Sequence, residues 1–230
     1  MKIALIGYGK MGRIIETLAQ EKGDEIVARI DENNSENLAE QLNGADAAID
    51  FSNAEAVRRN VEACLAANVP LVEGTTGWNV EKDEIKNLIE FKNGAFVFGA
   101  NFSVGVNLFY RIADFTSKLF AKFDDYEVFF EEQHHSKKLD APSGTALKLK
   151  EIVEQNIKKD FSVSSTRAGR IPGTHRVGFD GAADQILLEH FARSREGFAS
   201  GAIVAAHWIV GRKGFFEFTD VMDEIIKNEM

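Results

Sequence analysis

Residues 2–12, KIALIGYGKMG, decide the fold class of this chain. The apolar run 2–6 is typical of a buried parallel strand, and apolar residues recur at helical spacing after residue 12. Between them the spacing G-x-G-x-x-G permits a sharp turn, close approach of a pyrophosphate and tight packing of helix on strand. The segment therefore predicts a dinucleotide site, with a strand–helix turn that binds no ligand as the alternative. Its residues are Gly7, Tyr8, Gly9, Lys10, Met11 and Gly12.

A second predicted strand, residues 25–30, ends at Asp31, where a carboxylate suits the ribose hydroxyls of a dinucleotide. Glu32 follows, and two carboxylates repel the 2′-phosphate that distinguishes NADPH from NADH. Lys10 and Arg13, on the first helical turn, either form a solvated face or lie near the cofactor phosphates. We therefore expect NADH as the preferred cofactor, with residual use of NADPH.

Strand and helix patterns alternate through the first hundred residues. Further strands are predicted at 47–51, 69–72 and 95–98, and helices at 54–67 and 80–91. Such alternation predicts a doubly wound, Rossmann-type parallel sheet, in which ligands lie at the carboxyl ends of the strands. The segments after these strands should therefore share one crevice. In addition to the glycine turn and Asp31 they contain Gly74, Thr75, Thr76, Ala100, Asn101 and Phe102.

The pattern changes after residue 102. Helices are predicted at 103–122 and 146–158, and strands at 126–132, 176–179 and 185–191. Strands grouped in this way favour a second, α+β domain with a mostly antiparallel sheet. From residue 201 a helix, a short strand and a last helix are predicted to return to the first domain. We therefore place the first domain at 1–102 with a return at 205–230, and the second at 103–204.

The run 134–146, HHSKKLDAPSGTA, concentrates chemical groups in one segment. It joins two histidines to Lys138 and then to a Ser-Gly-Thr turn that precedes a predicted helix. Helix N-termini attract carboxylates because their first N–H groups lack intrahelical partners. The segment is predicted to hold an anionic substrate and give it a proton; a histidine pair in a polar surface turn is the alternative.

Composition narrows the class of protein. The chain has 230 residues and a net charge of −9, which argues against nucleic-acid and anionic-membrane partners. Its one cysteine, Cys64, cannot form an intrachain disulfide and falls on an apolar stripe. No metal-ligand spacing joins His175, His190 or His207 to the histidine pair, so no metal site is expected. Neither a signal peptide nor a long apolar span is evident, which favours the cytoplasm.

These segments resemble the dihydrodipicolinate reductase (4-hydroxy-tetrahydrodipicolinate reductase) family. Residues 132–146 match its signature E-x-H-H-x-x-K-x-D-A-P-S-G-T-A, and the resemblance covers essentially the whole chain. Other similar segments are 74–77, 100–107, 173–179 and 190–195.

The resemblance implies reduction of a cyclic dicarboxylate to tetrahydrodipicolinate, with loss of water, on the diaminopimelate route to lysine. NADH or NADPH supplies the hydride, His134 the proton, and Lys138 assists. It further implies a homotetramer assembled through the second domain. The residues implied to hold the substrate are His135, Ser143, Gly144 and Thr145.

The chain departs from the family in two places. A longer Gly/Arg-rich loop of many members is reduced to residues 163–166, which bears on the oligomer, and Glu32 replaces a basic residue.

Two other functions remain open. One is a related two-domain aspartate or homoserine dehydrogenase, which would lack the 141–145 loop. The other is a regulatory module that senses NAD(H) without turnover, against which His134 and Lys138 argue.

Overall fold

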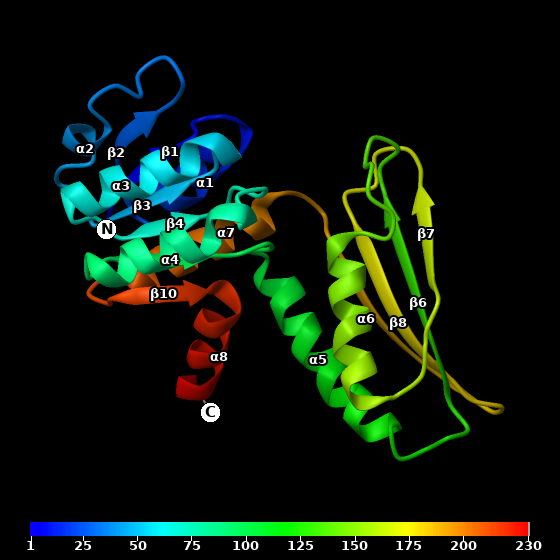
Figure 1. The fold of residues 1–230 in the computed structure, drawn as a ribbon. Coiled ribbons are helices and arrows are strands. Elements are labelled where there is room, and N and C mark those ends of the chain that lie inside the picture. The colour runs from blue at the N-terminus through cyan, green and yellow to red at the C-terminus, as the bar shows by residue number, and fades with distance from the viewer. Residues whose placement is uncertain (230) are drawn as a thin grey trace. The chain divides into compact units, whose positions relative to one another are not determined.

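The computed structural model describes residues 1–229, which divide into two compact units. One combines residues 1–104 with the segment from Glu196 onward, and the other is Gly105–Arg195 (Figure 1). None of the described helices is long and apolar enough to cross a membrane.

The first unit is built on a six-stranded parallel sheet in the order β10-β5-β4-β3-β1-β2. The strands are β1 (Lys2–Ile6), β2 (Glu25–Ile30), β3 (Ala47–Asp50), β4 (Leu71–Glu73), β5 (Ala95–Phe98) and β10 (Gly214–Glu217). Its helices are α1 (Lys10–Glu21), α2 (Leu38–Gln41), α3 (Val57–Ala67), α4 (Lys82–Phe91), α7 (Glu196–Ile209) and α8 (Phe218–Glu229). Short 3-10 turns precede α3 and α4.

Helices cover both faces of this sheet, because successive side chains of each strand point to opposite faces. Ile3 and Leu5 of β1 pack with α1, α7 and α8, whereas Ala4 and Ile6 pack with α2, α3 and α4. This explains why the strands are apolar without alternation. The predicted doubly wound sheet is confirmed. Cys64 of α3 is buried in the second of these cores, as its place on the apolar stripe predicts.

The second unit carries a four-stranded sheet in the order β7-β6-β8-β9. Its strands are β6 (Glu127–His134), β7 (Val163–Arg167), β8 (Thr174–Asp180) and β9 (Gln185–Phe191). The β6–β8 and β8–β9 pairs are antiparallel and β6–β7 is parallel, so the expected α+β fold with a mostly antiparallel sheet is also confirmed. Helices α5 (Val104–Phe120) and α6 (Gly144–Asn156) pack on one face through Phe109, Leu149 and Val153.

Several elements differ from the sequence-based expectation. Residues 163–167 are not a loop but strand β7, whose sequence VSSTR lacks an apolar alternation because the strand is a largely exposed edge. Strand β6 continues through His134, and α6 begins at Gly144. Helix α7 begins at Glu196 rather than residue 201, so the chain rejoins the first unit before residue 205.

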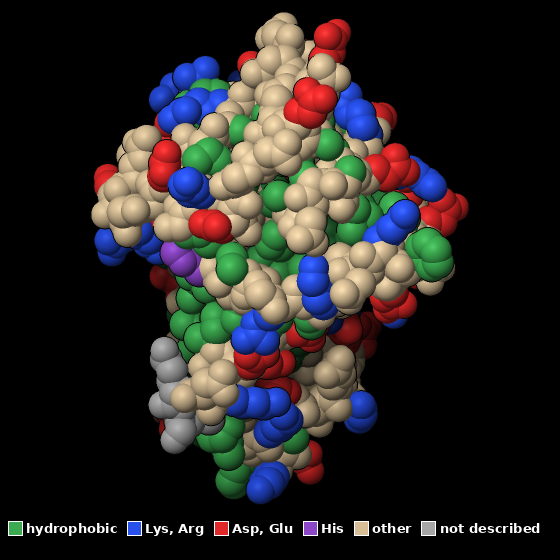
Figure 2. Space-filling model, turned by 90° about the vertical axis from the view of Figure 1, so that its left-hand side faces the viewer, with side chains coloured by type: hydrophobic (Ala, Val, Ile, Leu, Met, Phe, Trp, Pro, Cys, Tyr) green, Lys and Arg blue, Asp and Glu red, His purple; other side chains and the backbone are tan. Residues whose placement is uncertain are grey.

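In the space-filling view, basic and acidic side chains are interspersed over the face shown (Figure 2).

Candidate functional site

The glycine turn after β1 has the geometry that its spacing predicts. Gly7 has φ +79°, and a Cβ at this position would overlap the carbonyl group of Phe51. The N–H groups of Gly7 and Tyr8 both donate to the carbonyl oxygen of Ile30, at 2.9 and 3.0 Å. A side chain at Gly9 would meet nothing within 4 Å, so the backbone before α1 is open on that side.

Phe51, just after β3, joins the ends of four strands. In addition to its contact with Gly7, its ring lies so close to Gly74 that a Cβ there would overlap the ring atoms. The ring centroid is 6.3 Å from that of Phe102. The end of β1 thus meets the backbone of Phe51, and the ends of β4 and β5 meet its ring, in the region where a shared crevice was predicted.

The residues of segments 74–76 and 100–102 differ in their exposure to solvent. Thr75 is partly buried, Thr76 and Ala100 are exposed, and Asn101 is partly exposed. Phe102 is 2 % exposed and packs against Phe218, with ring centroids 4.7 Å apart, so its side chain is part of the core. Only the backbone of Phe102 is suited to contact a ligand.

Asp31 forms a turn at the end of β2. Its Oδ1 accepts from the N–H of Asn33 at 2.8 Å, and its own N–H donates to Asn34 Oδ1 at 2.7 Å. Nearby on α1, the guanidinium of Arg13 lies 5.0 Å from the centre of the Tyr8 ring, while Lys10 is exposed. Asp31 therefore keeps its second carboxylate oxygen outside this turn.

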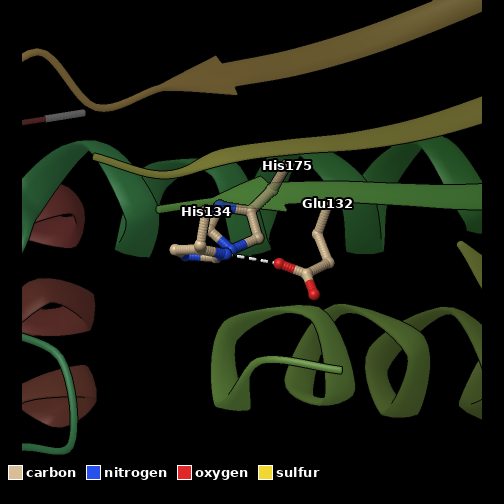
Figure 3. A group of neighbouring side chains, drawn as sticks. All are labelled: Glu132, His134 and His175. Carbon is tan, nitrogen blue, oxygen red and sulfur yellow. Dashed lines mark hydrogen bonds and ion pairs between the residues drawn. The ribbon is translucent and has the colours of Figure 1, made fainter. Parts of the chain in front are cut away.

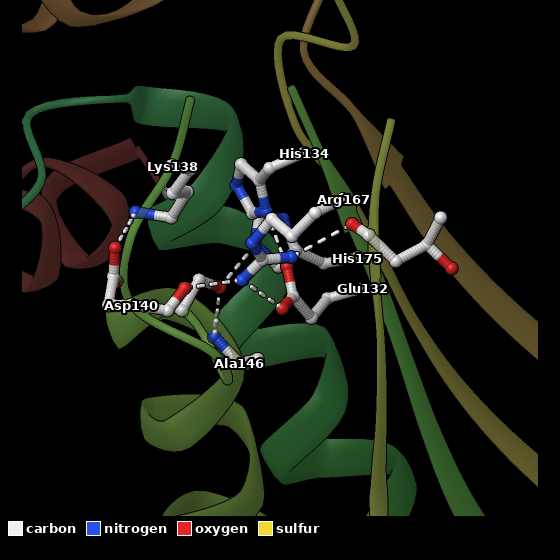
Figure 4. A network of polar contacts seen from close by, with 9 residues as sticks. Glu132, His134, Lys138, Asp140, Ala146, Arg167 and His175 are labelled. Carbon is white, nitrogen blue, oxygen red and sulfur yellow. Dashed lines mark hydrogen bonds and ion pairs between the residues drawn. The ribbon is translucent and has the colours of Figure 1, made fainter. Parts of the chain in front are cut away.

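The second unit brings together a buried cluster at the end of β6. In the sheet register Glu132 lies opposite His175, which lies opposite His190, so all three share the face that α5 and α6 cover. Glu132 Oε2 is hydrogen-bonded to His134 Nδ1, and Glu132 Oε1 is 2.6 Å from Arg167 Nη2 (Figure 4). His134 and Arg167 are paired in the β6–β7 register. The parallel edge strand thus brings a cation to a buried carboxylate that also holds the histidine.

The N-terminus of α6 closes another side of this cluster. Ser143 caps the helix by accepting from the N–H of Ala146 at 3.3 Å, and its Oγ is 3.1 Å from His175 Nε2. His175 and His134 pack edge to face, with ring centroids 5.1 Å apart. A side chain at Gly144 would meet nothing within 4 Å, so the helix end is open there. Thr145, partly exposed, is hydrogen-bonded to Tyr110 of α5.

Lys138 lies on the loop that joins β6 to α6. Its Nζ is 2.8 Å from Asp140 Oδ1, and its backbone N–H donates to the carbonyl oxygen of His135 at 3.1 Å. Arg167 also donates to the backbone carbonyl of Asp140, so the same guanidinium binds the loop and Glu132. The structure therefore gathers His134, Lys138 and the predicted helix turn around one loop.

Burial and charge set the protonation of this cluster. Burial lowers the pKa of His134, the Glu132 carboxylate opposes that effect, and the charges of Lys138 and Arg167 add to it. Burial lowers the pKa of His175 to about 4, so His175 is neutral at pH 7. Burial acts to raise the pKa of Glu132, but hydrogen bonds led by that from Arg167 outweigh it, and the carboxylate stays ionised.

Glu132, His134 and His175 also have potential metal-ligand atoms within 4.8 Å of one another (Figure 3). Glu132 and His134 lie two residues apart on β6, whereas His175 joins them only through the β6–β8 pairing, which the sequence does not indicate. The carboxylate already binds both the imidazole and the guanidinium of Arg167. We therefore interpret the group as a hydrogen-bonded histidine site, in which the guanidinium of Arg167 supplies the positive charge beside the carboxylate.

Sequence reasoning missed three residues of this site. Glu132 stands inside the matched signature, yet no local pattern indicates what its side chain contacts. Arg167 and His175 come from strands distant in sequence, and their partners depend on sheet register. In the first unit, the sequence likewise indicates Phe51 only as a strand end.

Comparisons with known proteins identify relatives along almost the whole chain. The family description "Dihydrodipicolinate reductase, N-terminus" matches residues 1–102, and "Dihydrodipicolinate reductase, C-terminus" matches 105–222. A 4-hydroxy-tetrahydrodipicolinate reductase of Christiangramia forsetii is 37% identical, covering 99% of this chain and 100% of its own. One of Archaeoglobus fulgidus is 35% identical, covering 97% and 100%. The fold resembles that of a dipicolinate-bound dihydrodipicolinate reductase from Paenisporosarcina, with TM-score 0.80, 21% identity, and coverage of 96% and 98%. The chain belongs to the dihydrodipicolinate reductase family.

Proposed function

We propose that the protein uses NADH or NADPH to reduce 4-hydroxy-tetrahydrodipicolinate to tetrahydrodipicolinate, on the diaminopimelate route to lysine. The observation that carries this proposal is the cluster at the end of β6. There a buried carboxylate holds His134 beside Lys138 and the N-terminus of α6. A solved relative that contains dipicolinate, a planar cyclic diacid, supports the class of substrate.

His134 is the proposed proton donor. Hydride arriving at a conjugated imine leaves charge on nitrogen, and a positioned acid of near-neutral pKa contributes about 10²–10⁴ in rate. Glu132 accepts from Nδ1, which fixes the ring and leaves Nε2 as the atom that faces away from this bond. An anionic substrate adds negative charge near His134 and so favours its protonated form. Lys138 stabilises the developing charge.

The substrate carboxylates are held by the loop and helix end. Gly144 begins α6, where N–H groups lack intrahelical acceptors and the partial helix charge is positive. Ser143 and Thr145 flank this position, and together with His135 they are the proposed side-chain contacts of the substrate. Ser143 also caps the helix, so its share of binding is largely through positioning of the helix end.

The cofactor is assigned to the strand ends of the first unit. The turn 7–12 holds the pyrophosphate, Asp31 the ribose, and the segments 74–76 and 100–102 the nicotinamide side. NADH is the preferred cofactor, because Asp31 and Glu32 disfavour a 2′-phosphate.

The proposed assembly is a cytoplasmic homotetramer formed through the second unit. In the part of the chain that the structure describes, α5 and α6 cover one face of its sheet, and Leu187 and Phe191 of β9 are 46% and 53% exposed on the other. Apolar side chains on an open sheet face are typical of an interface between subunits. Light scattering tests the tetramer directly, and a monomer would contradict it.

The function is tested by following cofactor oxidation with purified protein and 4-hydroxy-tetrahydrodipicolinate. Pyridine-2,6-dicarboxylate should compete with the substrate, since it presents two carboxylates on a planar ring. Oxidation of aspartate or homoserine with NAD⁺ would favour the alternative dehydrogenase. Binding of cofactor without turnover of any of these would favour a sensing module.

A further inference from the structure

Two carboxyl groups are buried side by side in the first unit, outside the cluster around His134. Asp50 ends β3 and Glu73 ends β4, and the two are directly paired in the parallel register. Both are 0% exposed. Among the described residues, no Lys, Arg or His forms an ion pair with either carboxyl. Two adjacent carboxylates without a counter-charge are costly in such a place.

The hydrogen bonds indicate which of the two carboxyls carries a proton. Asp50 accepts at both oxygens, from the N–H of Ser52 at 2.8 Å and from the side-chain amide of Asn60 at 2.6 Å. Glu73 Oε1 accepts from the N–H of Thr75 at 2.7 Å. Glu73 Oε2 is buried without a donor. The side chains of Asp50 and Glu73 are within hydrogen-bonding reach of each other. A proton held between them by Glu73 satisfies this oxygen and removes the second negative charge.

The same carboxyls hold the turns that follow their strands. Thr75 makes three hydrogen bonds there. Its N–H donates to Glu73, its Oγ1 accepts from the N–H of Ser52 at 3.1 Å, and its carbonyl accepts from the indole N–H of Trp78 at 2.9 Å. The N–H of Gly74 donates to the carbonyl of Asp50 at 2.8 Å. The path of residues 74–76 thus depends on how closely the two strand ends approach.

We propose that Asp50 and Glu73 share one proton and that protonated Glu73 positions the turn 74–76 for cofactor binding. This rests on the proposed assignment of that turn to the cofactor. Loss of the shared proton leaves two carboxylates in contact, and their repulsion displaces the anchor of Thr75. Glu73 is therefore a positioning residue, and cofactor affinity falls as pH rises through the pKa of the pair.

The surroundings of Asp50 and Glu73 also favour a protonated carboxyl. Helix α3 packs against it with Asn60 and Cys64, and neither brings a positive charge. Burial, followed by the charge of Asp50, raises the pKa of Glu73 well above its ordinary value. Burial also raises the pKa of Asp50, while hydrogen bonds from Ser52 and Asn60 oppose this. These directions agree with one proton held between two oxygens.

Glu73→Gln separates this role from simple structural support. The amide keeps the shape, its carbonyl accepts from Thr75 as Oε1 does, and its N–H donates to Asp50 without titrating. Glu62→Gln is the control, because it makes the same substitution, carboxyl to amide, on the exposed side of α3. The measurement is the dissociation constant for NADH, by fluorescence, from about pH 6 to about pH 9. One linked proton changes this affinity by at most about tenfold per pH unit.

The parent and Glu62→Gln should lose NADH affinity as pH rises, whereas Glu73→Gln should keep its affinity across the range. Equal pH dependence of the parent and Glu73→Gln would overturn the proposal. Infrared spectroscopy supplies a second measurement on the parent alone. A protonated-carboxyl C=O band that persists at neutral pH supports the shared proton, and its absence refutes it even if the variant does not fold. A parent that binds no dinucleotide while showing this band would refute the proposed cofactor site and the positioning role, but not the shared proton.

Discussion

Replacing Glu132 by glutamine changes one atom in the cluster that holds His134. In the parent, one carboxylate oxygen accepts from His134 Nδ1 and the other lies 2.6 Å from Arg167 Nη2. Glutamine has one accepting oxygen and one donating nitrogen. Its carbonyl oxygen therefore accepts a hydrogen bond either from Arg167 or from His134, and its NH₂ group faces the other residue. Glutamine cannot accept a hydrogen bond from both residues at once.

The expected cost follows from the bond that is lost. A charge-assisted hydrogen bond contributes about 1.5–3 kcal/mol, and about 1.4 kcal/mol corresponds to a factor of ten in rate. Turnover of Glu132→Gln should therefore fall about ten- to a hundred-fold. The ionised Glu132 also raises the pKa of His134. Its removal lowers that pKa, so the decline in turnover toward high pH should begin at lower pH than in the parent.

The assay is steady-state cofactor oxidation across pH, together with the dissociation constant for NADH. Glu131→Gln is a matched control on the same strand, since Glu131 points to the opposite face and pairs with Arg176 at 3.2 Å. That control should retain turnover and pH profile, and both variants should bind NADH as the parent does. A Glu132→Gln enzyme with the turnover and pH profile of Glu131→Gln would refute the positioning of His134 by Glu132.

Four further outcomes are expected. His134→Gln and Lys138→Ala should each lower turnover far more than NADH affinity, and a double variant whose loss equals their product would show that the residues do not act as a unit. Thr145→Val should raise the Michaelis constant for the diacid by the equivalent of about 1.5–3 kcal/mol, and an unchanged constant would place the carboxylate elsewhere. Glu32→Arg should shift the ratio of catalytic efficiencies toward NADPH at fixed ionic strength, and no shift would refute the proposed repulsion at the end of β2. Because the folded-state pKa of Glu73 is raised, the folded protein holds a proton that the unfolded chain releases. Urea unfolding should show stability falling by at most about 1.4 kcal/mol per pH unit between the unfolded and folded pKa values, with a flatter profile in Glu73→Gln; equal slopes would contradict this.

Local patterns are sufficient for most of the first unit because its elements have their own sequence signals. The apolar run 2–6, the glycine turn and the helical spacing after it specify strand, turn and helix without reference to distant residues. The second unit and its boundary are harder for a physical reason. Strand β7 is a polar edge strand with little to bury, and α7 begins at Glu196, inside the range 103–204 that the sequence assigns to the second domain. Helix α7 is apolar around most of its circumference because it is buried in the first unit, so it carries no amphipathic period that marks its start.

The residues that complete each site are those whose partners are set by pairing between strands. Glu132 meets His175 only because β6 and β8 are antiparallel in one register, and it meets Arg167 only because β7 is parallel to β6. Asp50 meets Glu73 for the same reason, across β3 and β4. A shift of one residue in any of these three pairings would turn the side chains of the shifted strand to the opposite face of its sheet and break the contact. Sequence motifs can therefore identify the groups that react, such as His134, whereas the buried carboxyls that orient them become visible only once the register is known.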